Sequence, residues 1–231
     1  MSFALAFSLA LTPPTVAQEA SDFTEPRSGI AFPLSLLPPG GGAAQHLVGT
    51  GIRTRTIFRI KVYALGLYVD SEAARRALPA FAGISRANLE RDARFYRSLL
   101  EMKFGMTVRL VMTRNVSGQD VANSFEDALR PRLDQAAAET AMPGASNSLE
   151  EFRSNLNLDE IPKGAEIVFS CNPGGRLETS VEGSRRPSIE APALCWALFD
   201  VYLGEKPISK GAKQTLIAGF PGLLGDLRHY P

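Results

Sequence analysis

The chain has 231 residues, of which 45% are hydrophobic and 21% charged, so it can bury a sizeable core and disorder is excluded as its dominant state. Its 25 basic and 24 acidic residues are mixed along the sequence, so no broad field favours a nucleic acid or an anionic membrane, and neither partner is expected. Cys171 and Cys195 lie far apart and have no clustered histidine, which argues against a zinc site. We expect them to be buried thiols rather than a disulfide.

The N-terminus carries an apolar run from Phe3 to Leu11, followed by two prolines and small residues around Ala17. This pattern resembles the apolar core and cleavage zone of a targeting signal, although a basic N-terminal region is absent, and a disordered leader is the alternative. A bilayer needs roughly 20 apolar residues, so stable membrane insertion is not expected. Either interpretation sets residues 1–27 outside the fold and leaves 28–231 as a single domain.

Strand signals begin after the turn-rich stretch that contains Gly40 to Gly42. Residues 52–56 and 58–69 are rich in β-branched and aromatic side chains, which predicts two strands with a tight reversal near Ile57 to Arg59. A third strand is expected in "MTVRLVMTR". Two more are expected in "AEIVFSC" and "RLETSVEG", where the joining "NPGG" is typical of a hairpin turn.

Helices are predicted between and after these strands. Ser71 is the expected N-cap of a helix that Pro79 ends, and a second helix is expected from Ser85 to about Glu101. Further helices are expected near Ser148, which has capping-box spacing with a glutamate, in "APALCWALFDVYLG", and as a closing pair in "SKGAKQTLIAGFPGLLGDL". The pattern predicts an α+β fold: one antiparallel sheet covered by helices.

The helix expected in "NVSGQDVANSFEDALRPRLDQAAAET" has one apolar stripe and a distinct start. Ser117 and Asp120 resemble a capping pair, and Pro131 is expected to kink or divide the helix. The stripe consists of Val121, Phe125, Ala128 and Leu129.

Several other features have a plain structural explanation. Trp196, Phe199 and Tyr202 share one nearly all-apolar helix, so core packing is favoured over a stacking platform. The adjacent carboxylates of Glu126 and Asp127 face different directions on a helix, which favours a solvated surface over acid–base work.

Four blocks in this order resemble the chalcone isomerase fold family and together cover about residues 45–227. The blocks are "LVGTGIRTRTIFRIKVYALGLYVD", "RNVSGQDVANSFEDAL", "IPKGAEIVFS" and "LCWALFDVYLGEKPISKGAKQTLIAGFPGLL". The resemblance implies an open-faced β-sandwich with a ligand cleft between the sheet and the helices. The family contains true isomerases, which close a chalcone to a flavanone, and non-catalytic relatives such as plastid fatty-acid-binding proteins and mitochondrial haem-holding members.

The family's functional positions favour the non-catalytic branch. The conserved arginine matches Arg53, and Tyr63 stands where isomerases have a threonine and the fatty-acid-binding branch a tyrosine. The isomerase tyrosine, asparagine and late hydroxyl residue fall on Val121, Ala128 and Val201. With Phe125 added from the apolar stripe, the candidate ligand-binding residues are Arg53, Tyr63, Val121, Phe125, Ala128 and Val201.

These replacements have a direct chemical meaning. Ring closure needs donors that hold a polyhydroxylated substrate and stabilise an enolate, and hydrocarbon side chains supply none. An alkyl tail of roughly 14 methylenes gains about 11 kcal/mol gross on burial, against an association cost of ~4–15 kcal/mol. A carboxylate is the natural partner of an arginine that faces an apolar cavity, and the Tyr63 hydroxyl is a second donor. Arg55, Arg59 and Lys61 flank the reversal and can reach water.

We therefore expect a non-catalytic monomer that binds a long-chain fatty acid without a cofactor, in a plastid or another organelle. The alternatives are a genuine chalcone isomerase, a haem-binding organellar relative, and a partner-binding helper without a ligand. Arg53 and Tyr63 are ten residues apart, two fewer than in plant isomerases, and this difference preserves strand parity. Mitochondrial relatives have a similarly short link, but no candidate axial histidine lies near this region, so a haem would be held mainly through its propionates on Arg53.

Overall fold

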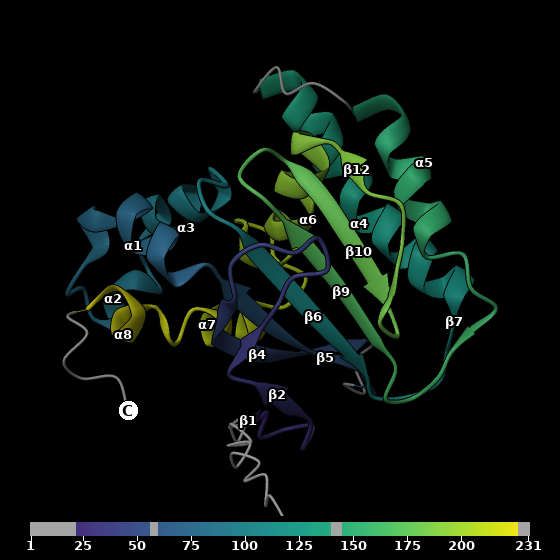
Figure 1. Cartoon of the computed structure of the whole chain (residues 1–231), viewed down its shortest axis with the longest axis horizontal. Helices are drawn as coiled ribbons and strands as arrows, with labels where there is room; N and C mark the ends of the chain where they lie inside the picture. Colours follow the sequence, from purple (N-terminus) through teal and green to yellow (C-terminus); the bar gives the residue numbers. More distant parts are fainter. Residues whose placement is uncertain (1–21, 56–59, 140–144, 226–231) are drawn as a thin grey trace, which may run out of the picture.

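The computed structural model describes residues 22–55, 60–139 and 145–225, and its centre is one antiparallel sheet with the strand order β11-β10-β9-β6-β5-β4-β3 (Figure 1). A further short strand, β12, pairs with β10, and a separate two-stranded sheet joins β7 to β8. The strands are β3 (Ser35–Leu36), β4 (Gln45–Arg55), β5 (Ile60–Val69), β6 (Met106–Met112), β7 (Val116–Ser117), β8 (Glu160–Ile161), β9 (Glu166–Cys171), β10 (Arg176–Val181), β11 (Ser184–Arg185) and β12 (Ile189–Glu190).

The helices gather on one face of this sheet and at one of its ends, so the predicted α+β open-faced sandwich is confirmed. In Figure 1, α6 lies behind the sheet, α4 and α5 lie on the right, and α1, α2, α3 and α8 form a group on the left. The apolar helix α6 is the centre of the main core, and its Phe199 is fully buried as expected. The helices are α1 (Ser71–Ala77), α2 (Arg86–Leu89), α3 (Ala93–Leu100), α4 (Gly118–Glu139), α5 (Ala145–Asn155), α6 (Pro192–Leu203), α7 (Lys210–Leu216) and α8 (Phe220–Leu224), with a short 3-10 turn at Pro79–Phe81.

A short hairpin of β1 (Asp22–Thr24) and β2 (Ala31–Pro33) packs on part of the second face of the sheet. Phe32 of this hairpin is fully buried against Ala64, Tyr68 and Val111. The expected domain boundary at residue 27 falls inside this hairpin, so Asp22–Thr24, which the prediction set outside the fold, pair with β2 of the domain. The expected leader signal itself lies in residues outside the described part of the chain.

Two helix starts differ from the prediction because a neighbouring aspartate is the better cap. The side chain of Asp70, rather than that of Ser71, accepts the backbone N–H of Ala73 at 3.0 Å at the start of α1. The helix expected to continue from Ser85 to Glu101 is two helices, α2 and α3. Asp92 interrupts it by capping α3, where its carboxylate accepts the N–H of Arg94 at 2.9 Å.

The long helix α4 begins as predicted, since the Asp120 N–H donates to the Ser117 hydroxyl at 3.4 Å. The helix is not divided at Pro131. Proline has no backbone N–H, so the carbonyl four residues earlier lacks its helical donor. Because this part of the helix is exposed, water can donate to that carbonyl instead. Ser148 is not a cap, because α5 already begins at Ala145. Within the described residues, no helix is both long and apolar enough to cross a bilayer.

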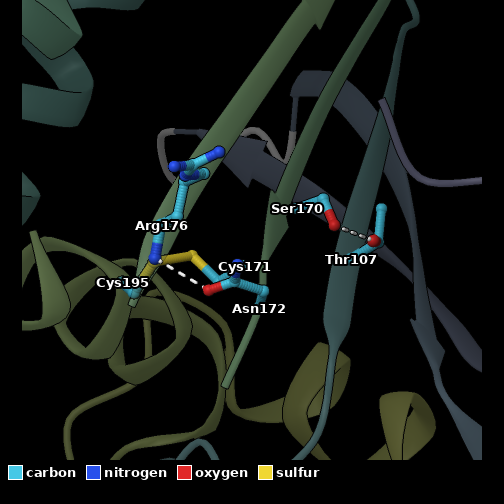
Figure 2. The surroundings of a disulfide bond; sticks show 6 residues. All are labelled: Thr107, Ser170, Cys171, Asn172, Arg176 and Cys195. Atoms are coloured by element: carbon cyan, nitrogen blue, oxygen red, sulfur yellow. Dashed lines mark hydrogen bonds between the residues drawn. A yellow bond between two sulfur atoms is a disulfide. The ribbon is translucent and has the colours of Figure 1, made fainter. Parts of the chain in front are cut away.

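The prediction of two free thiols is wrong: Cys171 and Cys195 form a disulfide with a Cα–Cα distance of 5.9 Å. Figure 2 shows the bond beside the β9–β10 turn, where the Arg176 N–H donates to the Asn172 side-chain oxygen at 3.0 Å. Both cysteines are fully buried. Cys171 ends β9, and the chain returns through β10 and β12 to the start of α6, which brings Cys195 beside it. The bond therefore fastens α6 to the sheet.

Glycines in β4 allow α7 to pack directly on the strand backbone. A Cβ atom at Gly49 would lie 2.2 Å from the Thr215 carbonyl oxygen, and one at Gly51 would lie 2.9 Å from the Ala212 Cβ. Only a residue without a side chain permits such an approach. This packing places the segment before α7, which contains Ile208, over the helix-facing side of β4.

We expect Gly49→Ala to lower the free energy of unfolding by about 2 kcal/mol, because overpacking against a backbone cannot be relieved by a side-chain rotation. Chemical denaturation measures this change. Gly211→Ala in α7 is the matched control, since nothing lies within 4 Å of a Cβ atom there. Equal stabilities of the two variants would contradict the close approach of α7 to β4.

Candidate ligand-binding cavity

A cavity of about 510 Å³ lies between the sheet and helices α4 and α6. All of the residues proposed from the sequence line it: Arg53, Tyr63, Val121, Phe125, Ala128 and Val201. They come from four different elements, β4, β5, α4 and α6, that pack against one another in the main core. The other lining residues are Ile60, Val62, Arg114, Asn115, Val116, Ser117, Asp120, Ser124, Asp127 and Ile208.

Strand register brings the two polar candidates together. Arg53 of β4 is the direct cross-strand partner of Tyr63 of β5, so both side chains leave the sheet on the same face. The ladder shifts between Arg53 and Thr54, just before the reversal. The reversal itself, with the expected turn at residues 57–59, lies outside the described residues.

Arg53 is half-buried, and its guanidinium is anchored to the backbone. Its Nη1 donates to the carbonyl oxygen of Ile208 at 2.7 Å. None of the ion pairs among the described residues involves Arg53. A guanidinium has five N–H donors, so most of them remain free to bind an acceptor in the cavity.

Tyr63 and Tyr202 form a hydroxyl pair behind this guanidinium. Their oxygens lie 3.2 Å apart, and the side chains are 8% and 3% exposed. Burial raises the pKa of the Tyr63 hydroxyl above its usual range, against the opposing effects of the Tyr202 hydrogen bond and the Arg53 charge. Burial also raises the pKa of Tyr202 well above its usual range, and the nearby Tyr63 adds to that shift. Both hydroxyls therefore keep their protons at neutral pH.

The aliphatic positions expected from the sequence form the inner wall. Val121, Phe125 and Val201 are 8%, 5% and 1% exposed, and Ala128 is half-buried. They present methyl groups and a ring edge, and they offer neither a donor nor an acceptor. This wall can accommodate an alkyl chain but cannot orient a substrate through hydrogen bonds.

The mouth of the cavity is more polar than the sequence interpretation implied. Exposed side chains of α4 and the segment before it line the entrance: Arg114, Asn115, Ser117, Asp120, Ser124 and Asp127. Three of them, Asp120, Ser124 and Asp127, recur every three or four residues beside the apolar stripe of α4, which is the sequence signal that could have predicted them. The cavity is therefore amphipathic, with a polar rim and an apolar interior that ends at Arg53 and Tyr63.

The remaining charged candidates have structural partners or lie at the surface. Glu126 pairs with Arg153 at 2.7 Å and also with Arg130, as expected of a solvated helix face, and these arginines lower the pKa of its carboxyl. Lys61 is exposed and donates to the Arg27 carbonyl oxygen, whereas the Arg55 side chain and Arg59 lie outside the described part. The described residues contain no cluster of three or more histidine, cysteine, aspartate or glutamate side chains suited to a metal ion.

A curled antiparallel sheet, a layer of helices and an amphipathic cavity between them define a ligand-holding α+β protein of the open-faced sandwich class. Residues 43–217 match the family described as chalcone isomerase like, and the chain belongs to that family. The fold is similar to that in the crystal structure of an Arabidopsis thaliana fatty-acid-binding protein, with a TM-score of 0.73. The two sequences are 26% identical, and the match covers 88% of this chain and 99% of the other.

Relatives of two kinds are similar to this chain. It is 34% identical to Fatty-acid-binding protein 2 of Arabidopsis thaliana over 83% of its own length, but it spans only 49% of that relative. It is 28% identical to Fatty-acid-binding protein 1 of the same plant, covering 92% of this chain and 74% of the relative. Chalcone–flavanone isomerase of Oryza sativa subsp. japonica is 32% identical over 85% of this chain and 88% of its own. Overall similarity therefore does not separate binding from catalysis, and the cavity residues must do so.

Proposed function

We propose that the protein binds a long-chain fatty acid without transforming it, with the carboxylate on Arg53 and Tyr63 and the tail along the aliphatic wall. The observation that carries this proposal is a half-buried guanidinium without a carboxylate partner among the described residues, paired in register with a protonated tyrosine at an apolar cavity. An ionised acid supplies the acceptor that this pair lacks.

The dimensions of the cavity support an amphiphile of this size. Small-molecule sites typically enclose about 300–1,000 Å³, and the cavity of about 510 Å³ falls within that range. The tail supplies most of the affinity through burial of methylenes, and the head group fixes the orientation. The exposed carboxylates of Asp120 and Asp127 at the mouth disfavour a bound pose in which the anionic head stays at the rim, because like charges repel.

The relatives support this proposal and also supply its rival. Two of them carry the name fatty-acid-binding protein, which fits the Arg53 and Tyr63 arrangement. The isomerase of rice makes chalcone cyclisation the second candidate. The aliphatic wall argues against chalcone cyclisation, because the side chains of Val121, Ala128 and Val201 cannot donate hydrogen bonds to a polyhydroxylated substrate or to its enolate. An organellar location and a monomeric state stay predictions.

Native mass spectrometry of the gently purified protein, followed by incubation with a chalcone, tests the proposal. We expect an additional mass that matches an acyl chain and no protein-dependent decay of the chalcone's visible absorbance. Rapid decay that requires Arg53 would establish an isomerase instead. A cavity that is empty after purification and takes up no added fatty acid would favour a helper role without a ligand.

A further inference from the structure

Tyr202 is a polar residue at the head-group end of the cavity that does not belong to the cavity wall. Its side chain is 3% exposed, and its hydroxyl lies 3.2 Å from that of Tyr63, which does line the cavity. Among the described residues, no other group forms a hydrogen bond with the Tyr202 hydroxyl. The sequence interpretation assigned Tyr202 to core packing, which accounts for its ring but not for its hydroxyl.

Either oxygen could be the donor in this hydrogen bond, and counting protons favours one of the two directions. Each hydroxyl carries one hydrogen, and one of the two hydrogens lies between the oxygens. If Tyr63 donated, the hydrogen of Tyr202 would be left in the core without an acceptor, and buried unsatisfied donors are disfavoured. If Tyr202 donates, its own hydrogen is satisfied, and the hydrogen of Tyr63 can point into the cavity. The second arrangement leaves no buried donor unpaired.

The same arrangement makes the inner end of the cavity rich in donors. The guanidinium of Arg53 contains only donors. It donates one N–H to the Ile208 carbonyl oxygen, and within the described part of the chain its other N–H groups form no hydrogen bond. When the Tyr63 oxygen accepts the Tyr202 hydrogen, the Tyr63 hydrogen is not used in that bond, so Tyr63 also presents a donor to the cavity. An alcohol head group is neutral and accepts more weakly than an ionised carboxylate, which forms charge-assisted hydrogen bonds with both residues, so the alcohol gains less from this end.

We infer that Tyr202 is a positioning residue that holds the Tyr63 hydroxyl as a donor, so that the cavity selects an ionised acid over an alcohol of the same chain length. This inference rests on the proposed function, because it concerns the head group of the same ligand. The high pKa values that burial gives both tyrosines support it, since both hydroxyls keep the protons that the arrangement needs.

Head-group selectivity separates this role from simple packing. We would measure the binding of myristate and of 1-tetradecanol, which differ only at the head, by displacement of a fluorescent fatty acid. In Tyr202→Phe we expect myristate to bind about fivefold more weakly and tetradecanol to change by less than about twofold, which is the scale of one lost hydrogen bond. Tyr63→Phe combined with Tyr202→Phe should bind myristate no more weakly than Tyr63→Phe alone, because Tyr202 acts through Tyr63.

Tyr68→Phe is the matched control, because Tyr68 is fully buried on the same strand as Tyr63 but packs on the opposite face of the sheet. It should leave both affinities unchanged. Tyr202 would only fill the core if Tyr202→Phe lowered the affinities for myristate and tetradecanol by the same factor. The same conclusion would follow if the double variant lost myristate affinity by the product of the two single-variant factors. Wild-type protein that binds neither lipid would overturn the proposed function and this inference with it, whereas acid binding with an unchanged selectivity in Tyr202→Phe would overturn the role of Tyr202 alone.

Discussion

Replacing Arg53 by glutamine is expected to weaken the binding of a long-chain fatty acid about 30-fold, which corresponds to about 2 kcal/mol. The glutamine amide can still donate to the Ile208 carbonyl, so the backbone contact of Arg53 has a substitute and the fold is expected to persist. What is lost is the positive charge and the second donor toward the carboxylate, and hydrogen bonds to charged groups contribute more than neutral ones. Calorimetric titration of the delipidated protein with a fatty acid measures the change.

Arg114→Gln is the matched control for this experiment. Arg114 also lines the cavity, but it is exposed at the mouth, where water and salt screen its charge. We expect less than a threefold change in affinity, together with a weaker salt dependence of the association rate. If Arg53→Gln and Arg114→Gln weakened binding equally, the carboxylate would be held by general attraction at the mouth rather than by Arg53.

Removing the disulfide is expected to lower the free energy of unfolding by about 3 kcal/mol, because the bond closes a loop between residues that are 24 apart in sequence. The double variant Cys171→Ala and Cys195→Ala, compared with the wild type in urea denaturation, measures this loss. Because the bond fastens α6 to the sheet and α6 carries Val201 and Tyr202, fatty-acid affinity should fall as well, by a smaller factor than in Arg53→Gln.

The double variant loses two buried sulfur atoms as well as the disulfide bond. Denaturation of the wild-type protein with and without a reductant separates these effects, because reduction breaks the bond and keeps both cysteine side chains. The stability of the wild type should fall by a similar amount once the thiols are free, since both experiments release the same loop. Reduction that leaves the unfolding midpoint unchanged, or titration that finds two reactive thiols in the native protein, would contradict a disulfide in the folded state.

Most of the architecture could be predicted from local patterns in the sequence. The strand predicted in "MTVRLVMTR" and the hairpin turn predicted after Cys171 are both found. The apolar stripe of α4 and the all-apolar character of α6 indicated helices with buried faces, and both helices contribute to the main core. These signals are local, and each follows from the side-chain period of one element. Helix starts were less certain because Asp70 competed with Ser71 for one cap, and Asp92 starts a helix that had been predicted to continue from Ser85.

What depended on contacts between distant elements was missed or only partly seen. Nothing in the separate surroundings of Cys171 and Cys195 indicates that β12 returns the chain to bring them together. Tyr202 was recognised as buried, but its hydroxyl partner lies 139 residues earlier in the chain. The polar rim of the cavity was not predicted, because the three positions that have become hydrocarbon indicate only the apolar wall. Arg53 and Tyr63 were found through the family resemblance. That both face the same side of the sheet could be predicted because strand parity, unlike a distance in space, can be counted along a sequence.

The most direct test of the account is the ionisation of a bound fatty acid labelled with carbon-13 at its carboxyl group, followed by NMR as the pH is lowered. A carboxylate held by a guanidinium has a lowered pKa. The chemical shift of the bound carboxyl should therefore stay at the value of the ionised form even at a pH well below that at which the free acid titrates. In Arg53→Gln the bound carboxyl should instead become protonated at a higher pH. A bound carboxyl that titrates like the free acid, with or without Arg53, would contradict the account.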